Sequence, residues 1–376
     1  MKNAGGGLVV GGGIGGMAAA LALARAGLRV KLIEQDPQWN ALGAGLTLNG
    51  GALRAFADLG VLDRVLAAGY GSVGPVRACD ADGTVLSEGP TAPVFGAGIP
   101  NMGGILRPPL HEVMRRAIAE AGVPVELGAS VRGYEERADG VAVMAADGNS
   151  TEYDWVVAAD GLFSRTRELL FPDAPGPRFT GQGCWRAVVP RPTDVTATWV
   201  YWGEHGKAGF NPISQDLMYV YLIETAQGNP RIPEEQWLDL LRQRLSAFGG
   251  HFPAIVDGLE EGSLINYRPL EVVLLAAPWN RGRVLLVGDA AHATTPHVGY
   301  GAGLAVEDAV VLAPMLAAAA SVTTCFEAFA ARRFERCRTI LEGSVALGDM
   351  EMAQAPFAAQ RQLSAWLATV IREPTG

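Results

Sequence analysis

The fold is decided by Leu8-Val9-Val10-Gly11-Gly12-Gly13-Ile14-Gly15-Gly16, close to the start of the chain. Its three leading apolar residues predict a short buried strand that runs into a glycine-rich turn. The alanine- and leucine-rich stretch from Met17 to Ala26 predicts a helix, and Arg29 to Ile33 predicts a second apolar strand. Together these segments predict one βαβ unit.

The glycines of the turn have the spacing GxGxxG. In this pattern the first glycine permits a tight turn, the second lets the backbone approach a pyrophosphate, and the third lets the helix pack against the strand. The helix that follows presents unpaired N–H groups and a partial positive charge to an anion. Glu34 ends the second strand, where it can accept hydrogen bonds from ribose hydroxyls and would repel a 2′-phosphate. We therefore expect the ADP half of a dinucleotide to bind at Gly11, Gly13, Ile14, Gly16 and Glu34. A glycine turn without a ligand is the alternative, and the turn does not separate FAD from NAD.

Charge and cysteine content exclude several classes of function. The chain of 376 residues has 30 Lys and Arg against 39 Asp and Glu, a net charge of −9, with no basic cluster, so nucleic acid is not an expected partner. The four cysteines form no CxxC pair and no cluster with histidine, which predicts reduced thiols in a cytoplasmic protein and no metal site. No run of about 20 apolar residues occurs, so no membrane insertion is expected.

Segments further along the chain predict a second sheet. Tryptophan and tyrosine concentrate in β-prone segments between Gly181 and Glu224, which predicts an antiparallel sheet forming the wall of an aromatic pocket. Before it, Leu110 to Ala121 predicts a helix opened by two prolines, and strands at 140–144 and 152–158 flank an Asp-Gly turn. After it, 283–287 predicts a buried parallel strand, and a long helix from Leu304 should be kinked or interrupted by Pro314.

Two more motifs end in an aspartate beside a glycine. The strand Asp154-Trp155-Val156-Val157-Ala158-Ala159 runs into Asp160-Gly161. The strand Arg283-Val284-Leu285-Leu286-Val287 runs into Gly288-Asp289, and Pro296, Gly299, Gly301 and Gly303 follow before the next helix. Asp289 can bond a ribityl or ribose hydroxyl, and the glycine loop can bring backbone N–H groups to a flavin.

In this order, the three motifs resemble the GxGxxG, DG and GD motifs of the group A flavoprotein aromatic hydroxylases, which are single-component FAD monooxygenases. The resemblance implies an α/β fold with a glutathione-reductase-type Rossmann FAD domain (1-70, 100-180 and 278-376) and an interleaved antiparallel-sheet substrate domain (71-99 and 181-277). It also implies further FAD contacts at Gly45, Leu46, Arg107, Asp160, Gly288, Asp289, Pro296, Gly299, Gly301 and Ala302. For Arg107 the alternative is a surface ion pair.

The same resemblance implies the reaction. FAD would be reduced by NADH or NADPH, and O2 would then form a flavin C4a-hydroperoxide that hydroxylates a small activated aromatic or N-heteroaromatic substrate. Segments 181–186, 209–210 and 218–221 are similar to salicylate hydroxylase, 6-hydroxynicotinate 3-monooxygenase and 2-heptyl-4-quinolone monooxygenase. Four positions depart from the family pattern: Tyr300 replaces a glutamine, Gly50-Gly51 replaces Pro-Asn, and Thr47 stands where those relatives carry a histidine. Ala208 stands where urate hydroxylases carry an arginine, which disfavours urate.

The resemblance and the aromatic segments together give candidate reaction residues. His297 could take a phenolic proton, with a satisfied loop histidine as the alternative, and Pro296 is expected to pack near the reacting atoms. Tyr219 is the third catalytic candidate. The expected substrate-binding residues are Thr47, Tyr201, Phe210, Asn211, Tyr219, Tyr221 and His297, with Trp202 as a further wall candidate.

Other functions on the same fold stay open. A halogenase, a reductase or a catalytically silent FAD-binding protein would share the motifs, although no Trp-x-Trp-x-Ile-Pro halogenase segment occurs. A monomer or a homodimer is expected.

Overall fold

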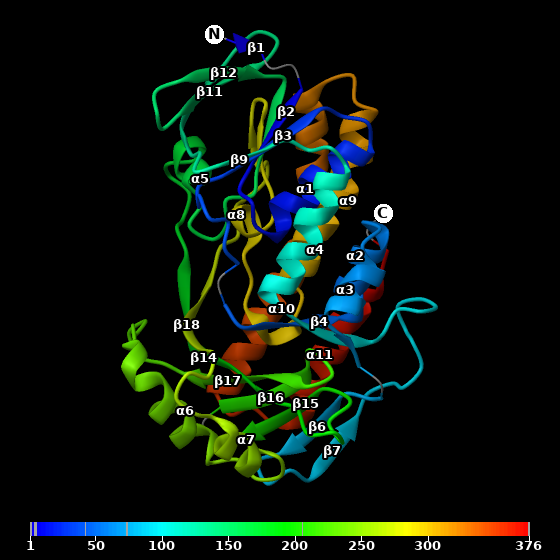
Figure 1. Cartoon of the computed structure of the whole chain (residues 1–376), viewed down its shortest axis with the longest axis vertical. Helices are drawn as coiled ribbons and strands as arrows, with labels where there is room; N and C mark the ends of the chain where they lie inside the picture. The colour runs from blue at the N-terminus through cyan, green and yellow to red at the C-terminus, as the bar shows by residue number, and fades with distance from the viewer. Residues whose placement is uncertain (1, 4–5, 42, 73, 205, 375–376) are drawn as a thin grey trace.

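A six-stranded sheet grows from the N-terminal βαβ unit and forms the upper part of the molecule (Figure 1). The computed structural model describes residues 2–3, 6–41, 43–72, 74–204 and 206–374. The strands lie in the order β19 (Asn280–Arg281), β20 (Val284–Leu286), β13 (Trp155–Ala158), β2 (Gly7–Val10), β3 (Val30–Glu34) and β9 (Val125–Leu127). All neighbours are parallel except β19 and β20. Every residue of β2 and β13 is buried, because layers of structure cover both faces of the sheet.

Three helices pack beside this sheet around the glycine turn. Helix α1 (Ile14–Arg25) lies against α9 (Gly301–Ala317) and α4 (Arg107–Glu120). The first turn of α4 contains Pro108 and Pro109. Proline lacks a backbone N–H, but no hydrogen bond is lost there because the first N–H groups of a helix have no partner within it. Pro314 was predicted to kink or interrupt the long helix; it does not interrupt it, and the kink stays a prediction. Helix α9 runs through Pro314 and ends three residues later, so the proline sits in its last turn.

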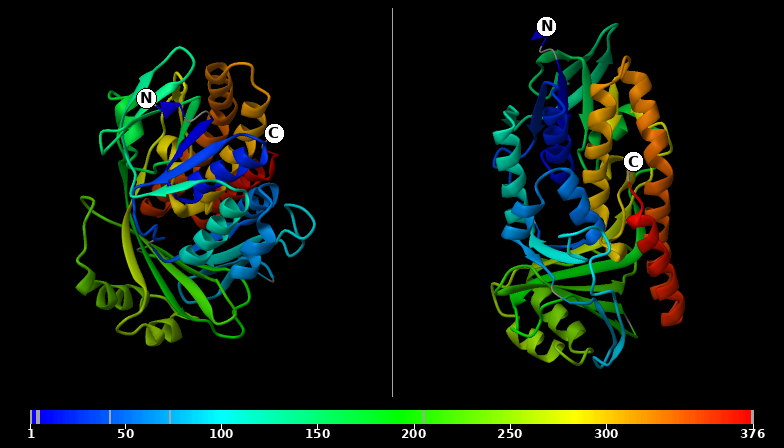
Figure 2. Two further views of the ribbon diagram at one scale, coloured as in Figure 1. Left: turned by 45° about the horizontal axis from the view of Figure 1, so that its top comes forward. Right: turned by 90° about the vertical axis from the view of Figure 1, so that its right-hand side faces the viewer.

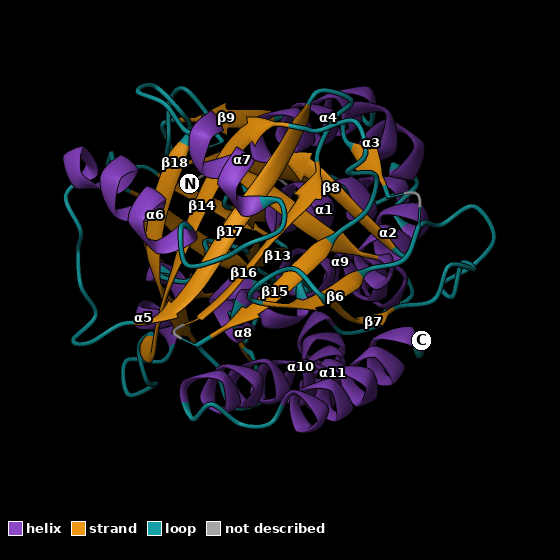
Figure 3. Cartoon of the chain, turned by 90° about the horizontal axis from the view of Figure 1, so that it is seen from below, coloured by secondary structure: helices purple, strands orange, loops and turns teal. Residues whose placement is uncertain are grey.

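A seven-stranded sheet forms the lower part of the molecule, as the aromatic segments predicted. Its order is β18 (Ile265–Val272), β14 (Arg178–Pro190), β17 (Leu217–Thr225), β16 (Gly206–Pro212), β15 (Trp199–Gly203), β6 (Arg77–Asp80) and β7 (Val85–Glu88). We call the face that carries Arg186, Asn211 and Tyr219 the inner face, and the opposite one the outer face. Helices α6 (Trp237–Leu245) and α7 (Phe252–Gly258), joined to η1 (Glu234–Gln236), cover the outer face (Figure 3). The inner face is turned toward the six-stranded sheet.

Two small sheets complete the strands. One contains β1 (Lys2–Asn3), β12 (Ser150–Tyr153), β11 (Val141–Ala145) and β10 (Val131–Glu136), and the other contains β4 (Gly45–Asn49), β8 (Met102–Leu106) and β5 (Tyr70–Gly71). The expected hairpin at 140–158 is present between β11 and β12. The second predicted strand is two strands, however, because the chain leaves β12 at Asp154 and enters the six-stranded sheet as β13.

The remaining helices lie between strands of the sheets or after the last strand, β20. Helices α2 (Gly50–Asp58) and α3 (Leu62–Ala68) follow β4, α5 (Arg165–Leu170) follows β13, and α8 (Asp289–His292) and η2 (Pro296–Val298) follow β20. The long α10 (Val322–Met352) packs on α9 and reaches down to β14 and β16, with α11 (Phe357–Arg372) beside it (Figure 2). Within the described ranges, no helix is both long and apolar enough to cross a membrane. The predicted domain boundaries stay a prediction.

Candidate active site

The glycine turn has the geometry that its spacing predicts. Gly11 has φ +104°, a conformation that favours glycine. A Cβ at Gly16 would lie 1.8 Å from the carbonyl oxygen of Gly11, so only glycine lets α1 approach the strand this closely. A Cβ at Gly13, in contrast, would meet no protein atom within 4 Å. Gly13 therefore faces open space, and the first N–H groups of α1 have no side-chain cap.

Glu34 lies in a pocket beside this turn. Its carboxylate accepts hydrogen bonds from the backbone N–H groups of Gly12 at 2.6 Å and of Asp36 at 2.8 Å. Arg107 forms no ion pair with any described residue and points into the same pocket. The pocket is lined by Gly12, Gly13, Ile14, Glu34, Asp36, Trp39, Asn40, Ala41, Arg107 and His111.

Trp39 and His111 were missed by the sequence analysis. The Trp39 indole donates a hydrogen bond to the carbonyl of Gly12 at 2.8 Å, and its ring packs edge-on against His111 with centroids 5.3 Å apart. No periodic pattern marks either residue, since one lies in a loop and the other on the buried side of α4. Neither residue carried a signal in the sequence by which it could have been found.

The Asp-Gly motif of β13 lies next to the glycine turn, because a Cβ at Gly11 would lie 2.5 Å from the carbonyl oxygen of Ala159. The Asp160 carboxylate accepts hydrogen bonds from the Ser164 hydroxyl at 2.5 Å and the Thr166 N–H at 2.9 Å. Both donors belong to the first turn of α5 and its cap. Asp160 thus stabilises the start of α5, and its contact with FAD stays a prediction.

The Gly-Asp motif is held by a buried ion network. Gly288 has φ +59°, and its N–H donates to Asp308 of α9 at 2.9 Å. The same Asp308 oxygen lies 2.7 Å from His292 Nε2, and the other accepts from Arg333 at 2.8 Å. Asp289 itself is exposed, so its side chain is available to a ligand.

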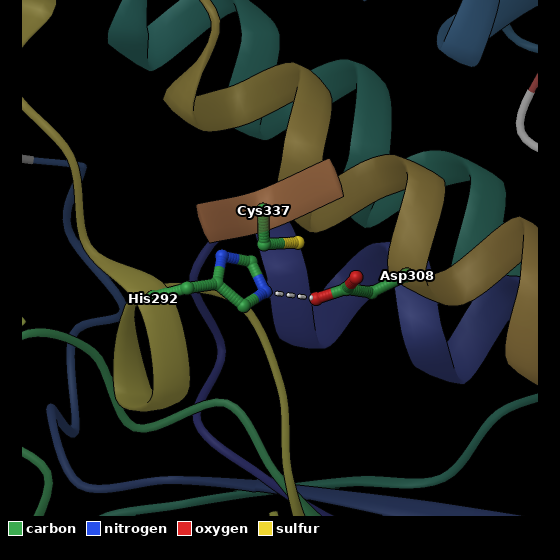
Figure 4. A group of neighbouring side chains, drawn as sticks. All are labelled: His292, Asp308 and Cys337. Carbon is green, nitrogen blue, oxygen red and sulfur yellow. Dashed lines mark hydrogen bonds and ion pairs between the residues drawn. The ribbon is translucent and has the colours of Figure 1, made fainter. Parts of the chain in front are cut away.

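The side-chain N, O and S atoms of His292, Asp308 and Cys337 lie within 4.8 Å of one another, close enough that they could share a metal ion (Figure 4). The sequence showed no such cluster because the three residues come from α8, α9 and α10. Both Asp308 oxygens already have partners, and one partner is the Arg333 cation, which would repel a metal ion. We therefore assign this cluster to the support of the Gly288 turn.

The loop after α8, residues 296–299, lies beside β4. The Asn49 amide donates to the carbonyl of Val298 at 2.9 Å, and Gly299 has φ +61°. Gly301 and Ala302 begin α9, whose N-terminus has no side-chain cap. Tyr300, in place of the family's glutamine, is fully buried and donates to Glu307, so its ring leaves the backbone of the loop accessible.

Part of the predicted substrate wall is assembled on the inner face. The Thr47 hydroxyl donates to Asn211 at 2.7 Å, and a Cβ at Gly45 would lie 2.8 Å from the Tyr219 side chain. The Tyr219 and Tyr221 rings lie 5.9 Å apart. Thr47 also lies next to Gly299, because a Cβ there would be 3.9 Å from the threonine methyl. Thus β4, the sheet and the 296–299 loop converge at one place.

Tyr201 and Phe210 lie on the other side of the sheet. Both side chains are fully buried on the outer face, where they pack with Phe252 of α7, and the Tyr201 hydroxyl bonds His251 at 3.0 Å. Their side chains therefore do not reach the inner face, and their role as substrate residues stays a prediction, because alternation along a strand separates two faces without showing which one meets the site. Trp202 is on the inner face, but its indole donates to Gln360 of α11.

His297 is also placed differently from the expectation. Its side chain has 0% exposure and points toward Gly348 of α10. Nδ1 bonds Thr295 at 2.9 Å, and Nε2 lies 3.3 Å from Glu351. Protein atoms surround the ring, and its predicted contact with a substrate stays a prediction.

Arg186, on β14, lies in the segment 181–186, and no role was predicted for it from the sequence. It is shielded by the inner face, where it hydrogen-bonds the Tyr219 hydroxyl. Burial raises the pKa of Tyr219 to about 12, although Arg186 acts in the opposite direction. Among the described residues, every other arginine that is not exposed donates to a carboxylate or a carbonyl, and Arg186 does neither. The neighbouring charge of Arg107 has the same sign.

The fold and the turn define a dinucleotide-binding protein. Its seven-stranded sheet lies at the end of the site that is remote from the Glu34 pocket. The open space at Gly13, the uncapped start of α1 and the free cation of Arg107 fit the pyrophosphate of FAD. A family model described as an FAD binding domain matches residues 7–342. The chain therefore belongs to this family, whose members here are FAD-dependent monooxygenases, and FAD is its cofactor.

Individual relatives agree with this assignment. The chain is 32% identical over 354 residues to the aurachin C monooxygenase/isomerase of Stigmatella aurantiaca, covering 93% of this chain and 91% of that protein. It is 32% identical over 367 residues to a 2-heptyl-3-hydroxy-4(1H)-quinolone synthase of Pseudomonas aeruginosa, covering 96% and 91%. The structure of Klebsiella pneumoniae HpxO with FAD and uric acid superposes with a TM-score of 0.87 at 23% identity, covering 98% and 97%, and shows the shared fold.

Proposed function

We propose that this protein uses FAD, NAD(P)H and O2 to hydroxylate a small activated aromatic or N-heteroaromatic substrate. Arg186 carries the proposal, because it is a shielded cation without a counter-ion on the face turned to the 296–299 loop. A buried charge is costly unless it is paired, so the missing anion is expected from a ligand. A ring that carries an ionised hydroxyl or a carboxylate would supply it, and ionisation also activates a ring toward electrophilic oxygen.

The roles of the other residues follow from their placement. FAD, when bound, supplies the redox chemistry between NAD(P)H and O2. Arg186 would hold the substrate anion, Tyr219 and Tyr221 would pack along the ring, and the Thr47–Asn211 pair would orient a polar edge. The N-terminus of α9 directs its positive end toward the 296–299 loop, which favours negative charge there. The backbone of the loop and of the start of α9 would lie against the flavin at Pro296, Gly299, Gly301 and Ala302. The six-stranded sheet would bind FAD, and the seven-stranded sheet would bind the substrate.

The test of the function begins with the purified protein. We expect a yellow protein with bound FAD, whose NAD(P)H oxidation is stimulated by at least one hydroxylated aromatic acid or N-heterocycle, with a hydroxylated product. A panel of such compounds, read by NADH and by NADPH absorbance, also decides the electron donor. Bound FAD without stimulation by any compound would remove the hydroxylase assignment and leave a flavoprotein with other chemistry.

Replacement of Arg186 by glutamine is expected to weaken binding of the anionic substrate by about 10- to 100-fold, since hydrogen bonds to a charged group contribute roughly 1.5–3 kcal/mol. The measurement is titration of the flavin absorbance with 2-hydroxybenzoate and with the uncharged 2-hydroxybenzamide. Tyr201→Phe is the matched control, because it removes a polar group from the outer face of the same sheet. An unchanged preference for the acid in Arg186→Gln would contradict this role.

A further inference from the structure

Three buried side chains from distant parts of the chain join the 296–299 loop to the inner face and to α10. Lys207 of β16 bonds one oxygen of Glu351 on α10, and the other oxygen lies 3.3 Å from Nε2 of His297. The exposed fractions are 9% for Lys207, 7% for Glu351 and 0% for His297. Charges so shielded from water are costly to separate, so the cluster holds its three elements together.

The hydrogen bonds behind His297 determine which ring nitrogen carries the proton. The Ser344 hydroxyl donates its single hydrogen to the carbonyl of Thr295 at 3.0 Å. In its 2.7 Å contact with Ser344, the Thr295 hydroxyl must therefore be the donor. Its hydrogen is then used, so in the 2.9 Å contact with His297 it can only accept, and Nδ1 must donate.

Nε2 is left as the second nitrogen of the ring, and it has no hydrogen-bond partner among the described residues. The Glu351 oxygen at 3.3 Å is poorly aligned for a hydrogen bond, and the unsatisfied amide oxygen of Gln182 lies on the same side of Gly348. The charged or titratable groups around the ring are Lys207 on β16, Glu351 and Asp349 on α10, and Tyr221 on β17, which Glu351 influences.

These groups have opposite effects on the pKa of His297. Burial lowers the pKa of His297, Glu351 acts in the opposite direction, and Lys207 lowers it further. The ring is thus neutral at neutral pH, and a proton added at Nε2 would face the Glu351 carboxylate.

We propose that the Ser344–Thr295 hydrogen-bond chain holds His297 in the Nδ1-protonated tautomer, and that Glu351, with Lys207 as its counter-ion, is a positioning residue that anchors the 296–299 loop to the inner face and favours uptake of a proton at Nε2. His297 thereby has a role in the support of the loop, beside the substrate contact predicted for it from the sequence. The protonation of the ring and the anchoring of the loop do not depend on the proposed function; only the yield of product per NAD(P)H does.

The direct test is the nitrogen-15 spectrum of the histidine side chains in the FAD-bound protein. The chain has five histidines, and His297→Gln identifies the signal of interest. At pH 7.5 we expect a neutral ring with the proton on Nδ1. A proton on Nε2, a mixture of tautomers, or a doubly protonated ring would overturn the proposal.

Two substitutions should move the titration of His297 in opposite directions. Glu351→Gln removes the attracting carboxylate and should lower the pH at which the ring takes up a proton, whereas Lys207→Met removes the repelling cation and should raise it. A merely structural role of Glu351 would not give opposite signs. Glu342→Gln, an exposed acid on the same helix, is the matched control and should change nothing.

If Glu351→Gln does not fold because Lys207 is left unpaired, the double variant Lys207→Met with Glu351→Gln removes both charges and takes its place. We expect either variant to release FAD at least severalfold faster than the wild type, since the loop loses its anchor, and an unchanged release rate would contradict the anchoring role. Under the proposed function, product formed per NAD(P)H should also fall. If no compound stimulates NAD(P)H oxidation, the proposed function fails, while the spectra and FAD release still decide this inference.

Discussion

Replacement of Gly16 by alanine is expected to give a protein without bound FAD and with a disrupted turn. The new Cβ would lie 1.8 Å from the backbone oxygen of Gly11, and neither atom can move without separating α1 from β2. The measurements are the flavin absorbance of the purified protein and its thermal unfolding.

Gly13→Ala is the matched comparison, because its Cβ meets no protein atom within 4 Å. This variant should fold with the stability of the FAD-free wild type but bind FAD about 100-fold more weakly, roughly 2.7 kcal/mol, since the methyl group enters the space assigned to the pyrophosphate. Titration of the FAD-free protein with FAD measures the effect. Wild-type affinity in Gly13→Ala would show that the pyrophosphate lies elsewhere.

Replacement of Arg333 by methionine is expected to lower the free energy of unfolding by about 3–5 kcal/mol. Arg333 is 1% exposed and pairs with both Asp308 and Glu307, so its removal leaves two buried carboxylates short of a cation. The loss should appear in thermal and urea unfolding and should also weaken FAD binding, because Asp308 holds the Gly288 turn.

Arg338→Met provides the control on the same helix. Arg338 pairs with Glu335 and Glu342 on the solvent side, with an exposed fraction of 41%. An exposed pair contributes little, so a change within about 0.5 kcal/mol is expected. Equal losses in the two variants would show that burial of the network is unimportant.

The same network predicts a dependence of stability on pH. Burial alone would lower the pKa of His292, but its interactions with Cys337 and Asp308 raise it well above 6.5. A pKa raised by folding stabilises the protein fully below the unfolded value, ~6.5, and this contribution is lost as the pH rises through the folded value. For Asp308, burial would raise the pKa, but His292 and Arg333 lower it to about 2, so its contribution is lost as the pH falls from about 3.8 toward 2.

His292→Gln should therefore remove part of the loss of stability on the alkaline side while lowering stability near pH 6. Melting temperatures of the wild type and this variant at pH 5, 6, 7.5 and 9 measure the difference. If the two curves stay parallel over this range, His292 is not protonated in the folded protein.

The sequence by itself determined the architecture and the adenosine end of the site. Strand and helix periodicity predict β2, α1 and β3, and the glycine spacing is informative because each glycine answers a local steric demand, as the contact of Gly16 with Gly11 shows. Glu34 could be predicted for the same reason. It ends the strand that follows the glycine turn and its helix, so its position beside the turn follows from the local sequence. The family follows from these motifs in order.

Only the tertiary structure decided which side chains meet. Alternation along β15 and β16 separates two faces, but the placement of α6 and α7 made the side of Tyr201 and Phe210 the outer one. His297 follows Pro296 in the sequence and yet turns to Glu351, and Asp308, Arg333 and Cys337 reach His292 from other helices. Electrostatic and packing partners of this kind are far apart in the chain. Their interaction energies depend on which elements the fold brings together, and a local sequence pattern does not contain that information. The unpaired cation of Arg186 became visible for the same reason, because a missing partner is recognised only after all neighbours are in place.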